Sequence, residues 1–119
     1  MFIASEKGHL EVVRELFARG AAVDAAKNTG ATPLFIASLE GHLEVVRELL
    51  ARGAAVDAAM NTGLTPLYIA SQNNHLEVVR VLLASGASSS IVANNGSTAL
   101  SRATANGHDA VAALLCAAR

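Results

Sequence analysis

Four histidines recur along this chain of 119 residues, each 33 residues after the one before. They are His9, His42, His75 and His108. Because histidine is the commonest metal ligand in proteins, the pattern first suggests a metal centre. A zinc ion, however, needs its nitrogen ligands about 2.0–2.1 Å away, and equivalent residues on packed neighbouring helices lie roughly 8–10 Å apart. We therefore predict no metal site, and we expect each histidine to have a structural role at the start of a helix.

Glutamates recur with the same spacing, and each of them precedes an arginine by three residues. The pairs are Glu11 with Arg14, Glu44 with Arg47 and Glu77 with Arg80. Carboxylates can serve in general acid–base catalysis, but opposite charges three residues apart on a helix typically form surface ion pairs. Such exposed pairs contribute less than about 1 kcal/mol each to stability. We interpret these glutamates as part of a solvated helix face and not as catalytic groups.

The other residues with nucleophilic side chains do not form a recognisable catalytic set. Residues 86–97 (GASSSIVANNGS) are rich in hydroxyl groups, but no histidine and aspartate recur at a spacing that suggests a triad, and the Gly-Lys-Ser/Thr signature of a phosphate loop is missing. Cys116 lies in an apolar segment and aligns with Phe17 and Leu50 of earlier repeats. We expect it to be a buried or half-buried small apolar residue. The sequence predicts no catalytic residue, no cofactor and no enzymatic activity.

Charge and hydropathy argue against several classes of partner. Nine basic and ten acidic residues give a net charge of -1, whereas nucleic-acid-binding domains cluster their lysines and arginines. No apolar run reaches the roughly 18 residues of a membrane-spanning helix, and the N-terminal segment lacks the features of a signal peptide. One cysteine cannot form a disulfide within the chain. We expect no nucleic-acid or membrane partner, and a cytoplasmic or otherwise intracellular location.

The same period of 33 residues runs through the whole chain. Residues 2–34 and 35–67 differ at only five positions, whereas residues 35–67 and 68–100 differ at 15. The last repeat, which begins near residue 98, diverges most. A fixed period of this length is typical of proteins that stack small supersecondary units into a solenoid.

Each repeat is expected to form two short helices and a turn, as the second one illustrates. Thr32 is a favoured N-cap, Pro33 suits the first helical position, and Gly41 ends this helix. His42 opens a second helix that carries its apolar residues on one side and ends at Gly53. Neither helix is long enough to be stable alone. Each helix pair must therefore bury its apolar side against the next pair.

Three motifs at this period carry a family resemblance: TPLFIAS (32–38), GHLEVVRELLARGAAVD (41–57) and NTG (61–63). They resemble the ankyrin repeat in order and spacing, over essentially the whole chain. The resemblance implies an all-α ankyrin-repeat solenoid of about four helix–turn–helix units joined by β-hairpin-like turns. Residues 1–119 would form a single domain, with units at about 1–31, 32–64, 65–97 and 98–119. It also implies binding of a protein partner through a concave face built from hairpin tips and first helices.

The sequence departs from the family pattern at several positions. The histidine of the family's TPLH motif is replaced by Phe2, Phe35, Tyr68 and Ser101. We expect the three aromatic rings to stack in register and so to replace a polar tie by packing. The acidic residue that usually opens the hairpin turn is replaced by Lys27, Met60 and Ala93. The chain also starts inside the first helix of its first unit, which fits either an abbreviated cap or an excised fragment.

The five differences between the first two repeats indicate where a partner would bind. One of them, Phe17/Leu50, exchanges apolar residues late in the second helix and is interpreted as packing. The others are Glu6/Leu39, Lys7/Glu40, Lys27/Met60 and Ala31/Leu64. These four flank the turn tips or end the first helices, whereas the exposed residues of the second helices are identical. We interpret Leu39, Met60 and Leu64 as an exposed apolar patch with a polar rim, as protein interfaces commonly have.

The predicted partner-binding residues extend this face through all the repeats. They are Glu6, Lys7, Lys27, Thr29, Ala31, Leu39, Glu40, Met60, Thr62, Leu64, Gln72, Asn73, Asn95, Ser97 and Asn106. Their variation has a simpler explanation too, because turn tips and helix ends tolerate change. We predict a non-enzymatic protein–protein interaction module that is a monomer or associates weakly end to end. The alternative is an engineered, consensus-like ankyrin scaffold, or a fragment of a longer array, with no dedicated partner.

Overall fold

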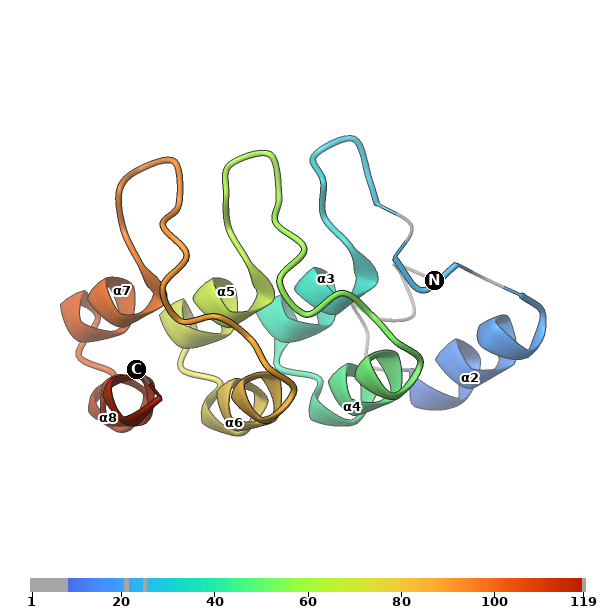
Figure 1. Cartoon of the computed structure of the whole chain (residues 1–119). Coiled ribbons are helices and arrows are strands. Elements are labelled where there is room, and N and C mark those ends of the chain that lie inside the picture. Colours follow the sequence, from blue (N-terminus) through green and yellow to red (C-terminus); the bar gives the residue numbers. More distant parts are fainter. Residues whose placement is uncertain (1–8, 21, 25, 119) are drawn as a thin grey trace.

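The computed structural model describes residues 9–20, 22–24 and 26–118 of the chain. Within these residues the protein forms seven α-helices and no β-strand. Figure 1 shows the helices stacked side by side in pairs, with a long loop rising between one pair and the next. The all-α solenoid expected from the repeats is therefore confirmed. None of the described helices has the length and apolar character needed to span a membrane.

The helices lie in two layers that correspond to the two helices of each unit (Figure 1). The first-helix layer contains α3 (Pro33–Glu40), α5 (Pro66–Gln72) and α7 (Ala99–Ala105). The second-helix layer contains α2 (Leu10–Ala18), α4 (Leu43–Ala51), α6 (Leu76–Ala84) and α8 (Asp109–Ala117). The hairpin-like loops project from the first-helix layer, away from the second helices. This arrangement separates the loop side of the molecule from the side formed by the second helices.

A threonine caps the start of every described first helix. The side chains of Thr32, Thr65 and Thr98 each accept the N–H of the third helical residue, at distances of 3.1–3.2 Å. Proline occupies the first helical position of α3 and α5. In α7, alanine replaces that proline. There the Ser101 hydroxyl accepts the main-chain N–H of Thr98 and completes a capping box. The predicted threonine caps are confirmed.

The turn between the two helices of a unit requires a left-handed residue. Gly41 has a φ of 75° there, and a Cβ atom at this residue would lie 2.6 Å from Nδ1 of His75 in the next unit. Asn74 holds the equivalent position with a φ of 61°. Asparagine tolerates this conformation better than most residues other than glycine. The predicted end of the first helix at Gly41 is confirmed. The absence of a side chain at Gly41 also makes room for His75 of the next unit.

The main core lies between the two layers and continues from unit to unit. Its largest members are leucines that recur at 33-residue spacing and are 0% exposed: Leu34 and Leu67 from first helices, and Leu49, Leu82 and Leu115 from second helices. Each such side chain contributes about 1.5–3 kcal/mol through burial. Because the buried cluster runs from Val13 of the first unit to Leu115 of the last, the described helices of one unit do not bury their apolar residues by themselves.

The histidines at the starts of the second helices link adjacent units. Nε2 of His75 donates to the Leu39 carbonyl at 3.0 Å, and Nε2 of His108 donates to the Gln72 carbonyl at 2.9 Å. A carbonyl can only accept, so these bonds place the proton on Nε2. The structural role expected for the histidines at helix starts is therefore confirmed at these two positions. Among the described residues, no group of three metal-ligating side chains comes together.

Candidate partner-binding face

The three described hairpin tips share one main-chain geometry. In the first, the N–H of Lys27 donates to the carbonyl of Ala31 at 3.0 Å, and the N–H of Gly30 donates to the carbonyl of Lys27 at 2.8 Å. The same two bonds close the tips at 60–64 and 93–97, with lengths of 2.8–2.9 Å. The glycine of each tip has a φ of 84–86°, a conformation in which other residues are strained. The tips are thus loops of equal main-chain shape, each closed by two hydrogen bonds.

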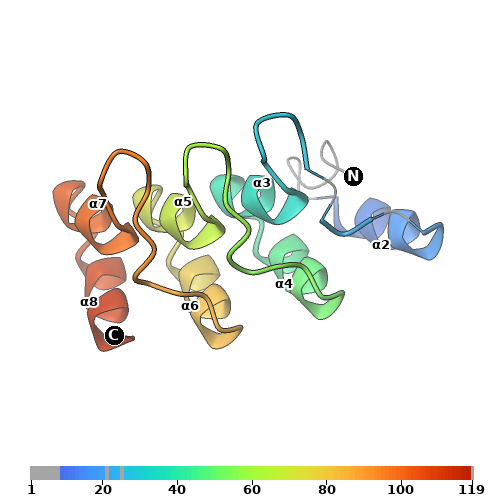
Figure 2. The same cartoon turned by 45° about the horizontal axis from the view of Figure 1, so that its top comes forward.

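Asparagine at the start of each NTG-type motif joins consecutive tips. The main-chain N–H of Asn61 donates to the Thr29 carbonyl at 2.8 Å, and its Nδ2 donates to the Asn28 carbonyl, also at 2.8 Å. Asn94 makes the same two bonds to Thr62 and Asn61, both at 3.0 Å. These asparagines therefore do more than shape a turn. They form a hydrogen-bonded ladder that fixes the spacing of the tips, which lie in a row in Figure 2.

Close packing between tips accompanies this ladder. A Cβ atom on Gly30 would lie 3.0 Å from the main-chain nitrogen of Asn61, and one on Gly63 would lie 2.9 Å from Oδ1 of Asn94. A Cβ atom on Gly96, in the third tip, would meet nothing within 4 Å. The first two tips are therefore closely covered on the side facing the next tip, whereas the third is open at its glycine.

The apolar residues predicted to form an exposed patch are half-buried. Leu39, Met60 and Leu64, together with Ile36, pack against a small buried cluster. That cluster consists of Ala31, Phe35 and Ile69. The prediction of an exposed patch is therefore wrong in its degree of exposure, because the close spacing of tips and first helices covers part of each side chain. We call Ile36, Leu39, Met60 and Leu64 the apolar patch.

Ala31 also differs from its predicted setting. It is 3% exposed and belongs to the buried cluster beneath the apolar patch. The corresponding residue of the next tip, Leu64, is half-buried. The prediction that Ala31 itself contacts a partner does not fit this burial, since the small alanine side chain is covered by its larger neighbours in the cluster. Its effect on a partner would be indirect, through the packing of those neighbours.

Two predicted binding residues instead tie units together. Nδ2 of Asn73 donates to the Leu39 carbonyl at 3.1 Å, and Nδ2 of Asn106 donates to the Gln72 carbonyl at 3.2 Å. Each asparagine shares its acceptor with the histidine two residues later. Glu40, at the equivalent position of the second unit, is exposed. Asn73 and Asn106 remain at the surface, but part of their hydrogen-bonding capacity is already used.

A chain of polar side chains occupies the third tip. Oδ1 of Asn95 accepts the main-chain N–H of Ser97 at 3.0 Å and also the Ser97 hydroxyl. The Ser97 oxygen lies 2.6 Å from the hydroxyl of Tyr68, whose residue is 3% exposed. Tyr68 is therefore buried and also forms a hydrogen bond to the tip. The sequence pattern predicts packing of the aromatic ring and not this bond. Phe2 of that column lies outside the described residues.

The remaining predicted residues have mixed exposure. Lys27, Thr29 and Thr62 are exposed at the tips, and Gln72 is half-buried at the end of α5. Glu6 and Lys7 lie outside the described residues. The described part of the face thus combines a half-buried apolar patch with exposed polar side chains around it.

The opposite side of the molecule carries the predicted ion pairs. Arg14–Glu11, Arg47–Glu44 and Arg80–Glu77 have nitrogen–oxygen distances of 3.0, 3.1 and 3.9 Å. All six side chains are at least half exposed. The prediction of surface pairs within the second helices is confirmed.

Glu48 joins the first two units in a way that the sequence did not indicate. Its carboxylate lies 3.0 Å from Arg14 Nε of the preceding unit and 2.8 Å from Arg52 Nε. Hydrogen bonds from Arg52 and Arg14 lower the pKa of Glu48 below its ordinary value. The Arg52 guanidinium also lies 5.1 Å from the centre of the Phe17 ring, within cation–π range. The Phe17/Leu50 difference therefore affects contact between units as well as packing.

Asp24 and Asp57 were not among the predicted sites, yet they also connect units. Asp24 accepts the main-chain N–H of Ala55 at 3.0 Å, and Asp57 accepts that of Ser88 at 3.1 Å. Each bond spans 31 residues. In these bonds, as in those of the asparagines and histidines, the donor belongs to the later unit and the acceptor to the earlier one. The Arg14–Glu48 pair runs in the other direction.

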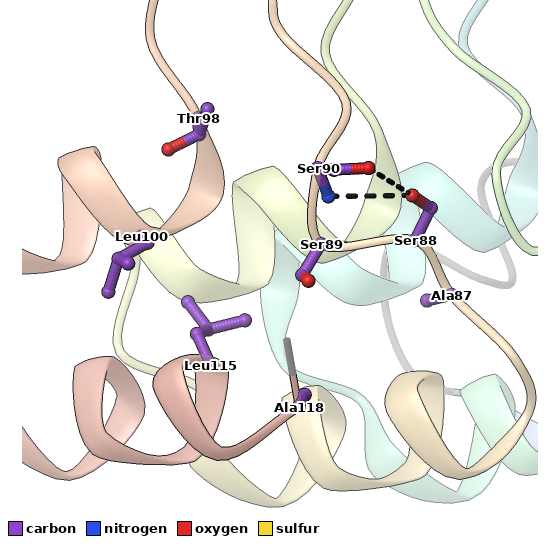
Figure 3. Close-up of a pocket in the computed structure, with 8 residues that line it drawn as sticks. All are labelled: Ala87, Ser88, Ser89, Ser90, Thr98, Leu100, Leu115 and Ala118. Carbon is purple, nitrogen blue, oxygen red and sulfur yellow. Dashed lines mark hydrogen bonds between the residues drawn. The ribbon is translucent and has the colours of Figure 1, made fainter.

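A groove of about 570 Å³ lies at the C-terminal end of the stack (Figure 3). It is lined by the hydroxyl residues Ser88, Ser89, Ser90 and Thr98 and by Ala87, Leu100, Leu115 and Ala118. None of these eight residues carries a titratable group suited to acid–base chemistry. The main-chain N–H of Ser88, one of the lining residues, donates to Asp57 of the preceding unit. The chemistry of the groove does not suggest an active site.

Cys116 differs from its expected environment. It is exposed on α8, not buried or half-buried as its apolar surroundings in the sequence suggested. The equivalent residues Leu50 and Leu83 are half-buried. Phe17 at the same position is also half-buried, so the alignment pointed to a partly covered side chain. The last second helix exposes more of this position than the earlier helices do.

Comparison with protein families identifies the architecture. A family model described as ankyrin repeats (3 copies) matches residues 1–60 and 52–119, which together cover the whole chain. The chain belongs to the ankyrin-repeat family. A comparison with curated proteins gives no match. Ankyrin repeats are generally protein–protein interaction modules and are typically not enzymes, so the family fits the non-catalytic chemistry of the surfaces described above.

Proposed function

We propose that this ankyrin-repeat protein binds another protein through its tip face. The tip face consists of the hairpin tips at 27–31, 60–64 and 93–97 and the adjacent surface of α3, α5 and α7. The observation that carries the proposal is the apolar patch. Its half-buried side chains lie beside exposed polar residues, on units that hydrogen bonds hold together. Protein interfaces commonly combine an apolar centre with a polar rim.

The rigidity of the tip face supports this role. The asparagine ladder and the histidine bonds fix successive units through main-chain acceptors. A partner that binds to such a framework does not have to order it, so less conformational entropy is lost on association. Methionine and leucine side chains in the patch can still adapt to a partner's shape. The face therefore offers fixed spacing together with adjustable apolar contacts.

The distribution of changes between the first two repeats points to the same side. Leu39, Met60 and Leu64 replace a charged or smaller residue of the preceding repeat, and all three lie in the apolar patch. The exposed glutamates and arginines of the second helices are identical between these repeats. Selection for a partner would produce this contrast, since it changes the contact surface and leaves the opposite side alone.

A charge-insertion experiment tests the proposal with little effect on the core. Thr29→Arg combined with Thr62→Arg places two cations on exposed tip positions. Ala51→Arg combined with Ala84→Arg adds the same charge at exposed ends of α4 and α6, in the second-helix layer. Proteins that the unmodified chain captures from a cell extract should be lost with the tip variant and retained with the second-helix variant, as measured by quantitative mass spectrometry.

Circular dichroism of both variants serves as the folding control. Equal capture by the tip variant and the unmodified chain would contradict the proposal. Loss of capture by the second-helix variant alone would place the binding surface on the other layer. Substituting the apolar patch itself would be a poorer test, because its packing against Phe35 and Ile69 makes binding and stability hard to separate.

A second candidate is a consensus-like scaffold with no dedicated partner. The near-identity of residues 2–34 and 35–67, including exposed second-helix positions, favours it. This candidate predicts that no protein is captured in a saturable manner by the unmodified chain at all. The same capture experiment therefore separates the two functions before any variant is compared.

A further inference from the structure

Asparagine precedes glycine at two places in the chain, Asn95–Gly96 and Asn106–Gly107. In a peptide, the main-chain nitrogen after an asparagine can attack the side-chain amide carbon, and glycine hinders this attack least because it has no side chain. The first two tips have Thr29 and Thr62 at the position of Asn95. A reactive dipeptide is therefore introduced at the third tip only.

We propose that Asn95–Gly96 is a site of spontaneous deamidation, and that the third tip promotes it. Asn95 is exposed, and its Oδ1 accepts hydrogen bonds from the N–H and the hydroxyl of Ser97. Two donors at this oxygen stabilise the negative charge that develops there when a nitrogen attacks the amide carbon. The buried Tyr68 hydroxyl, 2.6 Å from the Ser97 oxygen, holds that serine in place.

The reaction can be written with all atoms in place. The Gly96 nitrogen forms a bond to the Asn95 side-chain carbon, the bond from that carbon to Nδ2 breaks, and ammonia leaves with the proton from the Gly96 nitrogen. The product is a five-membered succinimide ring. Water then opens either of its two carbonyl–nitrogen bonds and leaves aspartate or isoaspartate at residue 95. No oxidant, reductant or enzyme is required.

The reaction also requires the turn to open, and the third tip is held least firmly. The Gly96 N–H is bonded to the Ala93 carbonyl at 2.9 Å, so this bond must break before attack. In the first two tips, the following asparagine ties down the carbonyls of the turn and packs against its glycine. Among the described residues no atom lies within 4 Å of a Cβ built on Gly96. Local opening therefore meets less resistance at the third tip.

Asn106–Gly107 provides a comparison within the same molecule. Its Nδ2, the leaving group, donates to the Gln72 carbonyl at 3.2 Å, and the N–H of Gly107 is bonded to the Thr104 carbonyl at 3.1 Å. Deamidation there would break a tie between units as well as a turn bond. We therefore expect the folded protein to deamidate several-fold faster at Asn95 than at Asn106.

Deamidation would change the chemistry of the tip face with time. An aspartate at residue 95 adds a negative charge and can keep accepting from Ser97, whereas isoaspartate adds a methylene to the main chain and disrupts the bond from Ala93 to Ser97. The effect on a partner rests on the proposed function, but the modification does not. A chain that deamidates at Asn95 and binds no protein would refute only the proposed function.

Peptide mapping by mass spectrometry during incubation at mildly alkaline pH tests the inference. We expect replacement of the amide by a carboxyl group at Asn95 well before Asn106 in the folded protein, and similar rates at both sites in denaturant. Ser97→Ala should slow the reaction at Asn95 several-fold and leave Asn106 unchanged, whereas Ser85→Ala, an exposed control, should change neither rate. Equal rates at the two sites in the folded protein, or no slowing by Ser97→Ala, would overturn the proposal.

Discussion

The two sides of the stack use different chemical groups to hold neighbouring units together. In the second-helix layer, an ion pair between charged side chains connects the first two units, where Glu48 bonds to Arg14 of the unit before it. On the tip face, amide and main-chain groups connect units, and Asn61 bonds to two carbonyls of the previous tip. Amide-to-carbonyl bonds use few side chains. The other side chains of the tips are therefore free to vary without loosening the stack.

This difference explains why the asparagine and glycine of the NTG motif stay constant while their neighbours change. Asn28, Asn61 and Asn94 carry the ladder, and the glycines of the first two tips allow the close approach of the next tip. Lys27 and Met60 occupy equivalent positions, and their main-chain groups close the turns in the same way. Sequence variation at the tips is permitted by the geometry, and a partner can make use of it.

The largest expected effect is a loss of stability when a leucine of the main core is truncated, compared with a leucine of the tip face. Leu49→Ala removes a side chain that is 0% exposed and should lower the free energy of unfolding by about 2–5 kcal/mol. Leu39→Ala removes a half-buried leucine of the apolar patch and should cost clearly less. Urea denaturation of both variants measures the difference. Equal losses would mean that the apolar patch is part of the core and is not available to a partner.

A smaller effect is expected from the packing between tips. Gly63→Ala and Gly96→Ala both place alanine at a φ of 84°, which costs roughly 1–2 kcal/mol. Gly63→Ala also places a Cβ atom 2.9 Å from Oδ1 of Asn94, whereas the Cβ of Gly96→Ala meets nothing within 4 Å. Thermal unfolding should therefore show a larger loss for Gly63→Ala. If the two variants lose the same stability, the ladder does not hold the tips closely together.

The smallest effect concerns the charges of the second-helix layer. The pKa of Glu48 is lowered in the folded protein, so its pairs with Arg52 and Arg14 stabilise the fold above the ordinary carboxyl pKa of about 4.3. This contribution is lost as the pH falls through the lowered pKa of the folded state. Glu48→Gln should therefore reduce the unfolding midpoint at neutral pH and match the unmodified chain in acid.

The matched control for this experiment is Glu44→Gln. This variant removes the exposed ion pair between Glu44 and Arg47, which lies within α4 and does not join two units. Its effect at neutral pH should be smaller than that of Glu48→Gln, because exposed pairs of this kind contribute little. A difference between Glu48→Gln and the unmodified chain that persists unchanged in acid would show that the side chain acts through packing and not through its charge.

The sequence was sufficient for those features that depend on neighbouring residues. Thr32 as a cap, Gly41 as a helix end and the Glu44–Arg47 pair all follow from local spacing, and the structure has them. The period of 33 residues also gave the solenoid, since repeated helices too short to be stable alone must stack. In these respects the fold could be predicted without knowing the distance between units.

Features that depend on the spacing between units were missed. The bonds from Asn61 to Asn28 and from Arg14 to Glu48 join residues 33 and 34 apart, and no local pattern distinguishes them. The half-burial of Leu39 has the same origin, because neighbouring tips and helices cover it. One signal was available, however: Asn28, Asn61 and Asn94 are constant where adjacent positions change. A residue that is constant among varied neighbours indicates a contact that recurs at every junction.

The direction of the ties between units has a consequence for how such a chain lengthens. Asn61 and His75 donate to the unit before them, and Asp57 accepts from the unit after it. A repeat inserted by tandem duplication of 33 residues therefore has hydrogen-bond donors for the unit before it and acceptors for the unit after it. It needs no compensating substitution at either junction. The bonding pattern thus allows the stack to lengthen by copying of whole repeats, and residues 2–34 and 35–67 are two such interchangeable units.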